Sequence, residues 1–250
     1  MNRSEYQGQN RLEFVPIKGR LHLDGKYLGN YWRNKAMYTG IVQACLEIQS
    51  ADRLPGLLTF GLTLPPELSE AVILGASIAV NGCCFTVTSM TTVPQGLNVT
   101  FDAIAETQAL TNIRDIKIGT RVNVERSAKQ DVEIGGHVLS GHIIDTAVVA
   151  EIEKTENNCR ITFSAGDAWL KYVFEKGYLA INGASLTVAA VDRVAKTFSV
   201  NLIPETLKRT NFSELSVRDE VNIEVESQSQ VIVDTVERIM SERYPDPSKI

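Results

Sequence analysis

The stretch Asn81-Gly82-Cys83-Cys84-Phe85-Thr86-Val87 returns almost unchanged as Asn182-Gly183-Ala184-Ser185-Leu186-Thr187-Val188, 182 − 81 = 101 residues later. In both copies an Asn-Gly pair stands between two short runs of strand-forming residues. Asn-Gly is the strongest short signal for a β-hairpin, because a tight type I′ turn needs two residues that accept a positive φ. The sequence therefore predicts two equivalent hairpins.

The repeat extends well beyond this phrase. Gly40-Ile41-Val42 begins 81 − 40 = 41 residues before the first Asn-Gly, and Gly141-His142-Ile143 begins 182 − 141 = 41 residues before the second. Further matched pairs are Glu106-Thr107 with Glu205-Thr206 and Asn123-Val124-Glu125 with Asn222-Ile223-Glu224. We predict two homologous halves, residues 37–133 and 134–230, which form a duplicated domain rather than a solenoid.

Short runs rich in Val, Ile, Thr and Phe alternate with turn residues throughout both halves, a pattern typical of antiparallel sandwiches and barrels. We therefore expect an all-β fold of two barrel-like halves in tandem. The strands expected in the first half are 38–48, 57–64, 77–80, 84–90, 97–101 and 121–125.

The composition excludes several classes of protein. A net charge of −5 argues against a nucleic-acid partner, which usually meets a basic face. No run approaches the roughly 20 apolar residues of a membrane span, and no apolar secretory signal opens the chain. The four cysteines show no Cys-x-x-Cys pair and no zinc-like spacing. We expect a reducing compartment, hence the cytoplasm, with no membrane partner.

The two ends of the chain differ from the repeat. Residues 1–36 carry seven Lys/Arg against three Asp/Glu and have no regular period. We interpret them as a misplaced start, an added extension or a disordered arm; the alternative is a partner-binding arm using Tyr27, Tyr31 and Trp32. After residue 230 the apolar residues follow a helical stripe, so we assign 231–250 to a helix and tail. This helix packs either against copies of itself or on its own barrel.

Two places in the repeat could carry chemistry. Cys84 aligns with Ser185 and Thr86 with Thr187. Residues 84 and 86 share one face of their strand, as do residues 185 and 187; the alternative is that these side chains fill a barrel interior. The stretch 135–142 holds two of the three histidines among three glycines. A histidine here could move protons near neutral pH or be structural, and a metal site lacks an evident third ligand.

Longer motifs resemble one enzyme family. They are MYTGIV at 37–42, GASIAVNGCCFTV at 75–87, VNVER at 122–126, EIGGHVLSGH at 133–142, KGYLAINGASLTV at 176–188, LIPETLKRTN at 202–211 and VDTVER at 233–238. In this order they resemble the riboflavin synthases, which contain two lumazine-binding repeats. The resemblance covers residues 37–250.

The resemblance implies a fold and a reaction. It implies two six-stranded antiparallel β-barrels in tandem plus a C-terminal α-helix that gathers three chains into a homotrimer. Each barrel would bind one 6,7-dimethyl-8-ribityllumazine, with the active site between barrels of neighbouring chains. Two lumazines would then dismutate by four-carbon transfer to riboflavin and 5-amino-6-(D-ribitylamino)uracil, with no metal and no cofactor.

The resemblance also implies site residues. His142 would carry protons, Cys84 and Ser185 would polarise the substrate or assist the nucleophile, and Glu226 stands where the family commonly has a catalytic-site Asp. The substrate-binding residues would be Tyr38, Ser77, Thr86, Glu106, Thr107, Lys176, Thr187, Ile203 and Thr206.

The sequence departs from the family pattern at three places: Tyr38 replaces the usual Phe, Gln108-Ala109 replaces a Leu-Arg pair, and Glu226 replaces Asp. Small displacements at a catalytic site are costly, so these positions bear on activity. The alternative function is that of an inactive lumazine or flavin carrier of the antenna type. Because such carriers tend to lose the Gly-His stretch and the second Glu-Thr-Leu motif, which this chain keeps, the pattern favours the enzyme.

Overall fold

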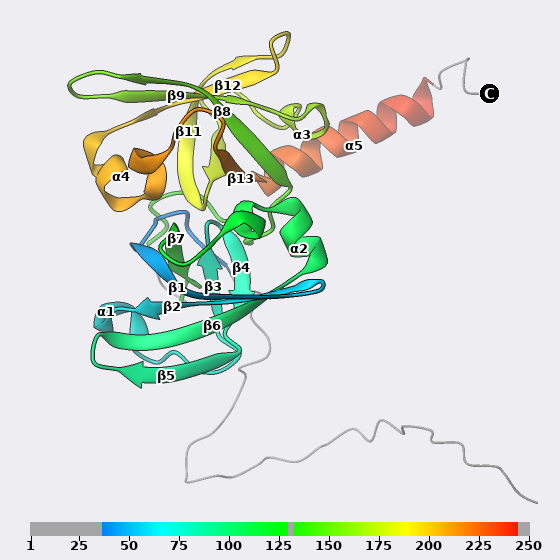
Figure 1. Cartoon of the computed structure of the whole chain (residues 1–250). Helices are drawn as coiled ribbons and strands as arrows, with labels where there is room; N and C mark the ends of the chain where they lie inside the picture. The colour runs from blue at the N-terminus through cyan, green and yellow to red at the C-terminus, as the bar shows by residue number, and fades with distance from the viewer. Residues whose placement is uncertain (1–36, 130–132, 245–250) are drawn as a thin grey trace, which may run out of the picture. The chain divides into compact units, whose positions relative to one another are not determined.

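The second half of the repeat forms a closed six-stranded antiparallel barrel (Figure 1). The structure is a computed structural model that describes residues 37–129 and 133–244. The barrel order is β10-β11-β12-β9-β8-β13. The elements of this half are β8 (Asp145–Lys154), β9 (Cys159–Ser164), α3 (Asp167–Leu170), β10 (Tyr178–Ile181), β11 (Ala184–Asp192), β12 (Thr197–Leu202), α4 (Pro204–Arg209), the 3-10 helix η2 (Asn211–Glu214) and β13 (Glu220–Val225).

The first half has the same strand order with one strand divided. Its sheet runs β4-β3-β7-β1-β2-β6-β5, so β4 and β5 together take the place of β11. Its elements are β1 (Ala44–Leu54), β2 (Leu57–Leu64), α1 (Pro66–Ser69), β3 (Ser77–Val80), β4 (Cys83–Thr86), β5 (Ser89–Val93), β6 (Gly96–Ile104), α2 (Ala105–Leu110), the 3-10 helix η1 (Asn112–Asp115) and β7 (Arg121–Arg126).

The division of β4 from β5 differs from the expected single strand over 84–90. The chain changes partners there, pairing with β3 before the break and with β6 after it. In the second half β11 changes partner from β10 to β12 at the same place, and its register shifts between Val188 and Ala190. A bulge lets a strand bend sharply, which closing a barrel requires. The all-β prediction of two barrels plus a helix is confirmed, with this break in the first.

Both predicted hairpin turns are present. Asn81 and Gly82 have φ values of 45° and 77°, and Asn182 and Gly183 have 43° and 78°. They join β3 to β4 and β10 to β11. The strongest local signal in the sequence thus determines the two turns from which the halves are built.

Each half has its own apolar core. In the first, Phe60, Phe85 and Phe101 pack with ring centroids 5.1–6.0 Å apart. In the second, Phe198 stacks on Phe163 and meets Trp169 edge-on. Because the inward side chains fill both interiors, the outward-facing residues of the strands are left for contacts between halves and with ligands.

The two hairpin turns meet each other in a seam of buried asparagines. Asn123 Nδ2 donates to the Asn182 carbonyl and Asn222 Nδ2 donates to the Asn81 carbonyl, each at 2.9 Å. Asn112 and Asn211 donate from their backbone to Asn222 and Asn123, respectively, at 2.7 and 2.8 Å. The bonds therefore come in reciprocal pairs related by the repeat. The repeated phrase serves the packing of one half on the other.

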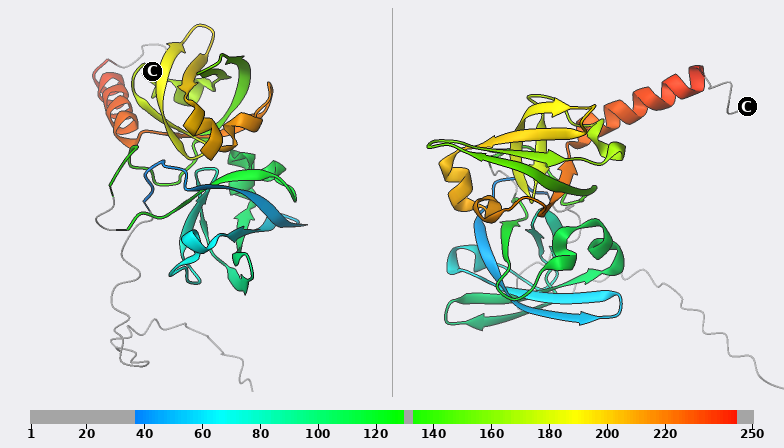
Figure 2. Two further views of the ribbon diagram at one scale, coloured as in Figure 1. Left: turned by 90° about the vertical axis from the view of Figure 1, so that its left-hand side faces the viewer. Right: turned by 45° about the horizontal axis from the view of Figure 1, so that its top comes forward.

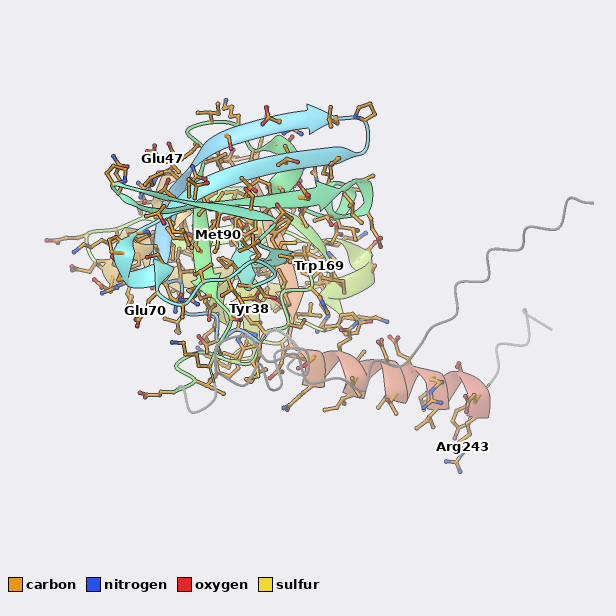
Figure 3. All side chains as sticks on the ribbon, turned by 90° about the horizontal axis from the view of Figure 1, so that it is seen from below. Tyr38, Glu47, Glu70, Met90, Trp169 and Arg243 are labelled. Atoms are coloured by element: carbon orange, nitrogen blue, oxygen red, sulfur yellow. The ribbon has the colours of Figure 1, made fainter. Side chains whose placement is uncertain are left out.

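The C-terminal helix α5 (Ser227–Arg243) begins at Ser227, ahead of the boundary at 231 drawn from sequence. Val233 packs on the second core, and Asp234 and Glu237 face Lys171. The far turns extend beyond the barrel in Figure 1 and in the right-hand view of Figure 2, and Figure 3 shows Arg243 near the far end of the helix. The expectations for residues 1–36 lie outside the described residues. Within the described part no helix is long and apolar enough to cross a membrane.

Candidate functional site

Two short segments cross between the halves and border both repeated phrases. We call Tyr38–Gly40 the first strap and Leu139–Gly141 the second strap. They pair with each other, since the backbones of Tyr38 and Leu139 exchange two hydrogen bonds of 2.9 Å. The first strap then accepts a bond from Ser185 N at the Gly40 carbonyl, 2.8 Å. The second accepts one from Cys84 N at the Gly141 carbonyl, 2.9 Å.

The straps are thus exchanged between halves. The first strap, which precedes the first barrel, binds the strand of the second barrel that carries Ser185. The second strap, which precedes the second barrel, binds the strand that carries Cys84. Close packing accompanies this exchange: a β-carbon at Gly40 would lie 2.5 Å from Ser185 Cβ, and one at Gly141 would lie 2.5 Å from Cys84 Cβ. Only glycine allows such contact, and both residues have a positive φ.

Cys84 lies on the outward face of the first half with Ser77 and Thr86. Ser77 and Thr86 are cross-strand partners on β3 and β4, and Cys84 precedes Thr86 by two residues on the same face. The buried Tyr38 donates its hydroxyl to Cys84 Sγ at 3.0 Å. Burial, reinforced by Cys84, raises the pKa of Tyr38, so the phenol stays protonated and acts as the donor. Figure 3 places Tyr38 inward of the surface residues Glu47 and Glu70.

Ser185 has a different polar neighbour at the equivalent place. His137 Nδ1 lies 2.6 Å from Ser185 Oγ, and the imidazole stacks on Tyr178 with ring centroids 5.3 Å apart. Tyr178 is the cross-strand partner of Thr187. Burial lowers the pKa of His137, so its ring is neutral near pH 7, while Glu226 opposes that shift. Its Nε2 is buried without a hydrogen-bond partner among the described residues.

Two buried glutamates hold the straps. Glu125 accepts bonds from Thr39 N (2.7 Å), Thr39 Oγ1 (2.8 Å) and Gly40 N (3.0 Å). Glu224 accepts the matching bonds from Ser140 N, Ser140 Oγ and Gly141 N at 2.7, 2.8 and 3.1 Å. Burial raises the pKa of each carboxyl group. Three donors around each carboxylate offset part of its desolvation.

The other predicted residues lie at several places. His142 is exposed directly after the second strap, and Lys176 is exposed ahead of β10 with a φ of 64°. Glu226 caps the start of α5, where Ser229 Oγ donates to its carboxylate at 2.5 Å. Glu106 and Thr107 lie on α2, Thr206 lies on α4, and Ile203 is exposed ahead of α4. Among the described residues no hydrogen bond joins α2 or α4 to Cys84 or Ser185.

A hollow of about 480 Å³ borders the asparagine seam, on the side of η1 and η2. The seam's amides already bond to one another, and Arg121 pairs with Glu214 at its rim. These amides and this ion pair are therefore already engaged within the protein. No group of three or more His, Cys, Asp or Glu among the described residues is arranged to hold a metal ion.

The comparisons with known proteins agree with this geometry. The lumazine binding domain family matches the chain twice, at residues 39–127 and 140–226. The riboflavin synthase of Escherichia coli K12 is 46% identical over 208 residues, which cover 83% of this chain and 95% of that protein. The riboflavin synthase of Chlamydia pneumoniae is 37% identical over 210 residues, covering 84% and 100%.

Two solved structures share the fold. LumP complexed with riboflavin has a TM-score of 0.69 and 25% identity, covering 76% of this chain and 100% of that one. LumP complexed with 6,7-dimethyl-8-(1'-D-ribityl) lumazine has a TM-score of 0.67 and 24% identity, covering 76% and 99%. The chain is therefore a protein of two lumazine binding domains in tandem. Within that class, it belongs to the riboflavin synthase family.

Three residues of this site were not predicted from the sequence as members of it. His137, rather than His142, is the histidine bonded to Ser185. Glu125 and Glu224 were recognised only as matching repeat positions. Each follows an asparagine by two residues on a strand and so shares its face, but only the structure shows that this asparagine is buried.

Proposed function

We propose that this protein is a riboflavin synthase that converts two molecules of 6,7-dimethyl-8-ribityllumazine into riboflavin and 5-amino-6-(D-ribitylamino)uracil. One lumazine gives a four-carbon unit to the other. The two products together contain all the atoms of the two substrates, so the reaction needs no external oxidant or group donor. The enzyme then has to hold two similar heterocycles together and move protons between them.

The observation that carries this proposal is that the strand faces of Cys84 and Ser185 occupy equivalent positions in the two halves but have different polar neighbours. The same hairpin presents a thiol beside a phenol in one half and a hydroxyl beside a neutral imidazole in the other. Equivalent folds suit two copies of one substrate, and different polar groups suit a donor and an acceptor. The identity with named riboflavin synthases exceeds that with LumP, which favours the enzyme over a carrier.

We assign the residues as follows. His142, exposed after the second strap, carries protons, including the one lost from the acidic C7 methyl group of the lumazine. Cys84 and Ser185 polarise or assist the attacking group, and Glu226 supplies a carboxylate near His137. The binding residues on the first-half side are Tyr38, Ser77, Thr86, Glu106 and Thr107; those on the second-half side are Lys176, Thr187, Ile203 and Thr206.

The assembly is part of the proposal. Val231, Ile232, Val236, Ile239 and Met240 of α5 are all more than 45% exposed. An apolar stripe of this kind favours burial against other copies of the chain. We propose a homotrimer in which the first barrel of one chain faces the second barrel of the next. We place it in the cytoplasm, where its four free cysteines would stay reduced.

The test is incubation of the purified protein with 6,7-dimethyl-8-ribityllumazine alone, followed by absorbance of riboflavin. Wild type should form riboflavin, and Cys84→Ser and His142→Ala should form it more slowly. A chain that starts at Met37 serves as the matched control for residues 1–36. Tight binding of lumazine without any riboflavin would instead identify a carrier.

A further inference from the structure

We propose that Glu125 and Glu224 are crossed positioning residues: each buried carboxylate, through the strap it holds, aligns the candidate site of the other half. Glu125 belongs to β7 of the first half and acts on Ser185 and His137 of the second. Glu224 belongs to β13 of the second half and acts on Cys84 of the first. The effect on catalysis rests on the proposed function, whereas the effect on position does not.

The first pathway starts at Glu125, which is 5% exposed. Its carboxylate binds both backbone amides and the hydroxyl of Thr39–Gly40. The two carbonyls of that segment then face the second half: Thr39 O accepts from His137 N at 3.1 Å, and Gly40 O accepts from Ser185 N at 2.8 Å. The two residues that share the 2.6 Å side-chain bond are therefore both fixed by one strap.

The second pathway repeats this in the opposite direction. Glu224, also 5% exposed, binds the amides and the hydroxyl of Ser140–Gly141. The Gly141 carbonyl accepts from Cys84 N at 2.9 Å. Cys84 N points away from the β3 ladder, so this strap supplies its partner. Tyr38, which donates to Cys84, pairs with Leu139 of the same strap.

The packing leaves the straps little room to move independently of their carboxylates. A β-carbon at Gly136 would lie 2.3 Å from the Thr39 carbonyl oxygen and 2.7 Å from Ser185 Cβ. Gly136 is thus packed between the first strap and Ser185, and Gly40 of that strap lies directly against Ser185 Cβ. A shift of the first strap would therefore displace Ser185, and a shift of Gly141 would displace Cys84 in the same way. Close-packed groups transmit such displacements rather than absorb them.

Glu→Gln substitution breaks this arrangement selectively. The amide oxygen can still accept from Thr39 or Ser140, but the amide nitrogen is placed against the N–H of Gly40 or Gly141. Two donors then face each other, and a charge-assisted bond is lost. The side-chain volume is nearly unchanged, so the core of each barrel is preserved.

The experiment is amide hydrogen exchange of the full chain, followed by mass spectrometry of peptides covering residues 82–86 and 184–188. Glu125→Gln should speed exchange in the Ser185 peptide about tenfold or more and leave the Cys84 peptide near wild type. Glu224→Gln should do the reverse. Glu47→Gln, on the exposed face of β1, is the matched control and should change neither.

Equal acceleration of both peptides in each variant, or acceleration confined to the half that carries the mutation, would overturn the proposal. If either Gln variant does not fold, Thr39→Val and Ser140→Ala each remove the hydroxyl that donates to the carboxylate, and Thr39→Val also removes the acceptor of the Ile41 N–H. Both should give the same crossed pattern at smaller size. Riboflavin formation should fall in both Gln variants and not in the control. If the variants show the crossed exchange pattern but even the wild type forms no riboflavin, the positioning role stands and the synthase is rejected.

Discussion

The side-chain amide of Asn222 lies 2.9 Å from the backbone carbonyl of Asn81, at the first hairpin turn. Asn222 is fully buried, and its Oδ1 also accepts the backbone N–H of Asn112 at 2.7 Å. One side chain of the second half thus satisfies two backbone groups of the first. The halves are joined by a polar seam whose geometry is specific, because each buried amide has only one arrangement that satisfies it.

We expect Asn222→Ala to destabilise the protein by about 2–5 kcal/mol, since it leaves the Asn81 carbonyl and the Asn112 amide buried without partners. Urea unfolding measures the change. Asn201→Ala is the matched control, because Asn201 is exposed on β12 and should cost little. Equal midpoints for the two variants would contradict a specific role of the seam.

Replacement of Gly82 by Ala should also destabilise the contact between the two halves. A β-carbon there would lie 2.7 Å from Gly183 N, and its φ is 77°. Gly56 has a similar φ of 75° but open space around it, so Gly56→Ala measures the backbone cost alone, about 1–2 kcal/mol. We expect Gly82→Ala to cost about 1–3 kcal/mol more than this control, because two backbones must move apart. Thermal unfolding of both variants provides the comparison.

Much of this fold follows from the sequence. The hairpin turns were predictable because Asn-Gly is a local signal, and the duplication because two distant segments share one spacing. The division of β4 from β5 was not, because Val87-Thr88 has ordinary strand residues and the break arises where the barrel closes. A change of partner strand is a property of the tertiary fold and leaves no local mark.

The site was harder to predict from the sequence than the fold was. The face of Cys84 and Thr86 follows from strand alternation, but the straps cross to the other half, a pairing that spacing does not encode. Glu125 and Glu224 lie in strands that alternate with apolar residues and so look solvent-exposed. His137 and His142 are both flanked by glycine, and only the fold shows that one is buried against Ser185 and the other is exposed.

The hydroxyl of Tyr38 can be removed at small cost. Tyr38→Phe deletes only the donor to Cys84 Sγ, a weak acceptor, so the free energy of unfolding should change by less than about 1 kcal/mol. Without that hydrogen bond the Cys84 sulfur is less restrained, and we expect faster alkylation of Cys84 by iodoacetamide. Peptide mass spectrometry distinguishes Cys84 from the adjacent Cys83, whose thiol is buried and has its pKa raised to about 12. An unchanged alkylation rate would show that the hydroxyl does not restrain the thiol.

The imidazole of His137 should titrate below its ordinary pKa of 6.5, because burial disfavours its charged form. A depressed pKa in the folded state means that stability is full above about pH 6.5 and is lost as the pH falls through the folded pKa. Glu226→Gln removes the charge that opposes this shift, so the pKa of His137 should fall further. NMR titration of the ring in wild type and Glu226→Gln measures both. A pKa that rises on this substitution would contradict the placement of Glu226 near His137.

Substitutions on the exposed face of α5 should weaken association of the chains without affecting the folding of the barrels. Val233 and Asp234 face the barrel, whereas Val236 and Ile239 are exposed. Sedimentation of wild type should give about three times the chain mass of 27.6 kDa. The double variant Val236→Ser with Ile239→Ser should shift the sedimenting mass towards that of a single chain. Arg238→Ser with Glu242→Ser changes exposed polar residues of the same helix and should leave the mass unchanged. Because the substituted apolar side chains do not touch the barrel core, the urea midpoint of the barrels should stay within error of the control pair. An unaltered mass in the apolar variant would assign association to another surface.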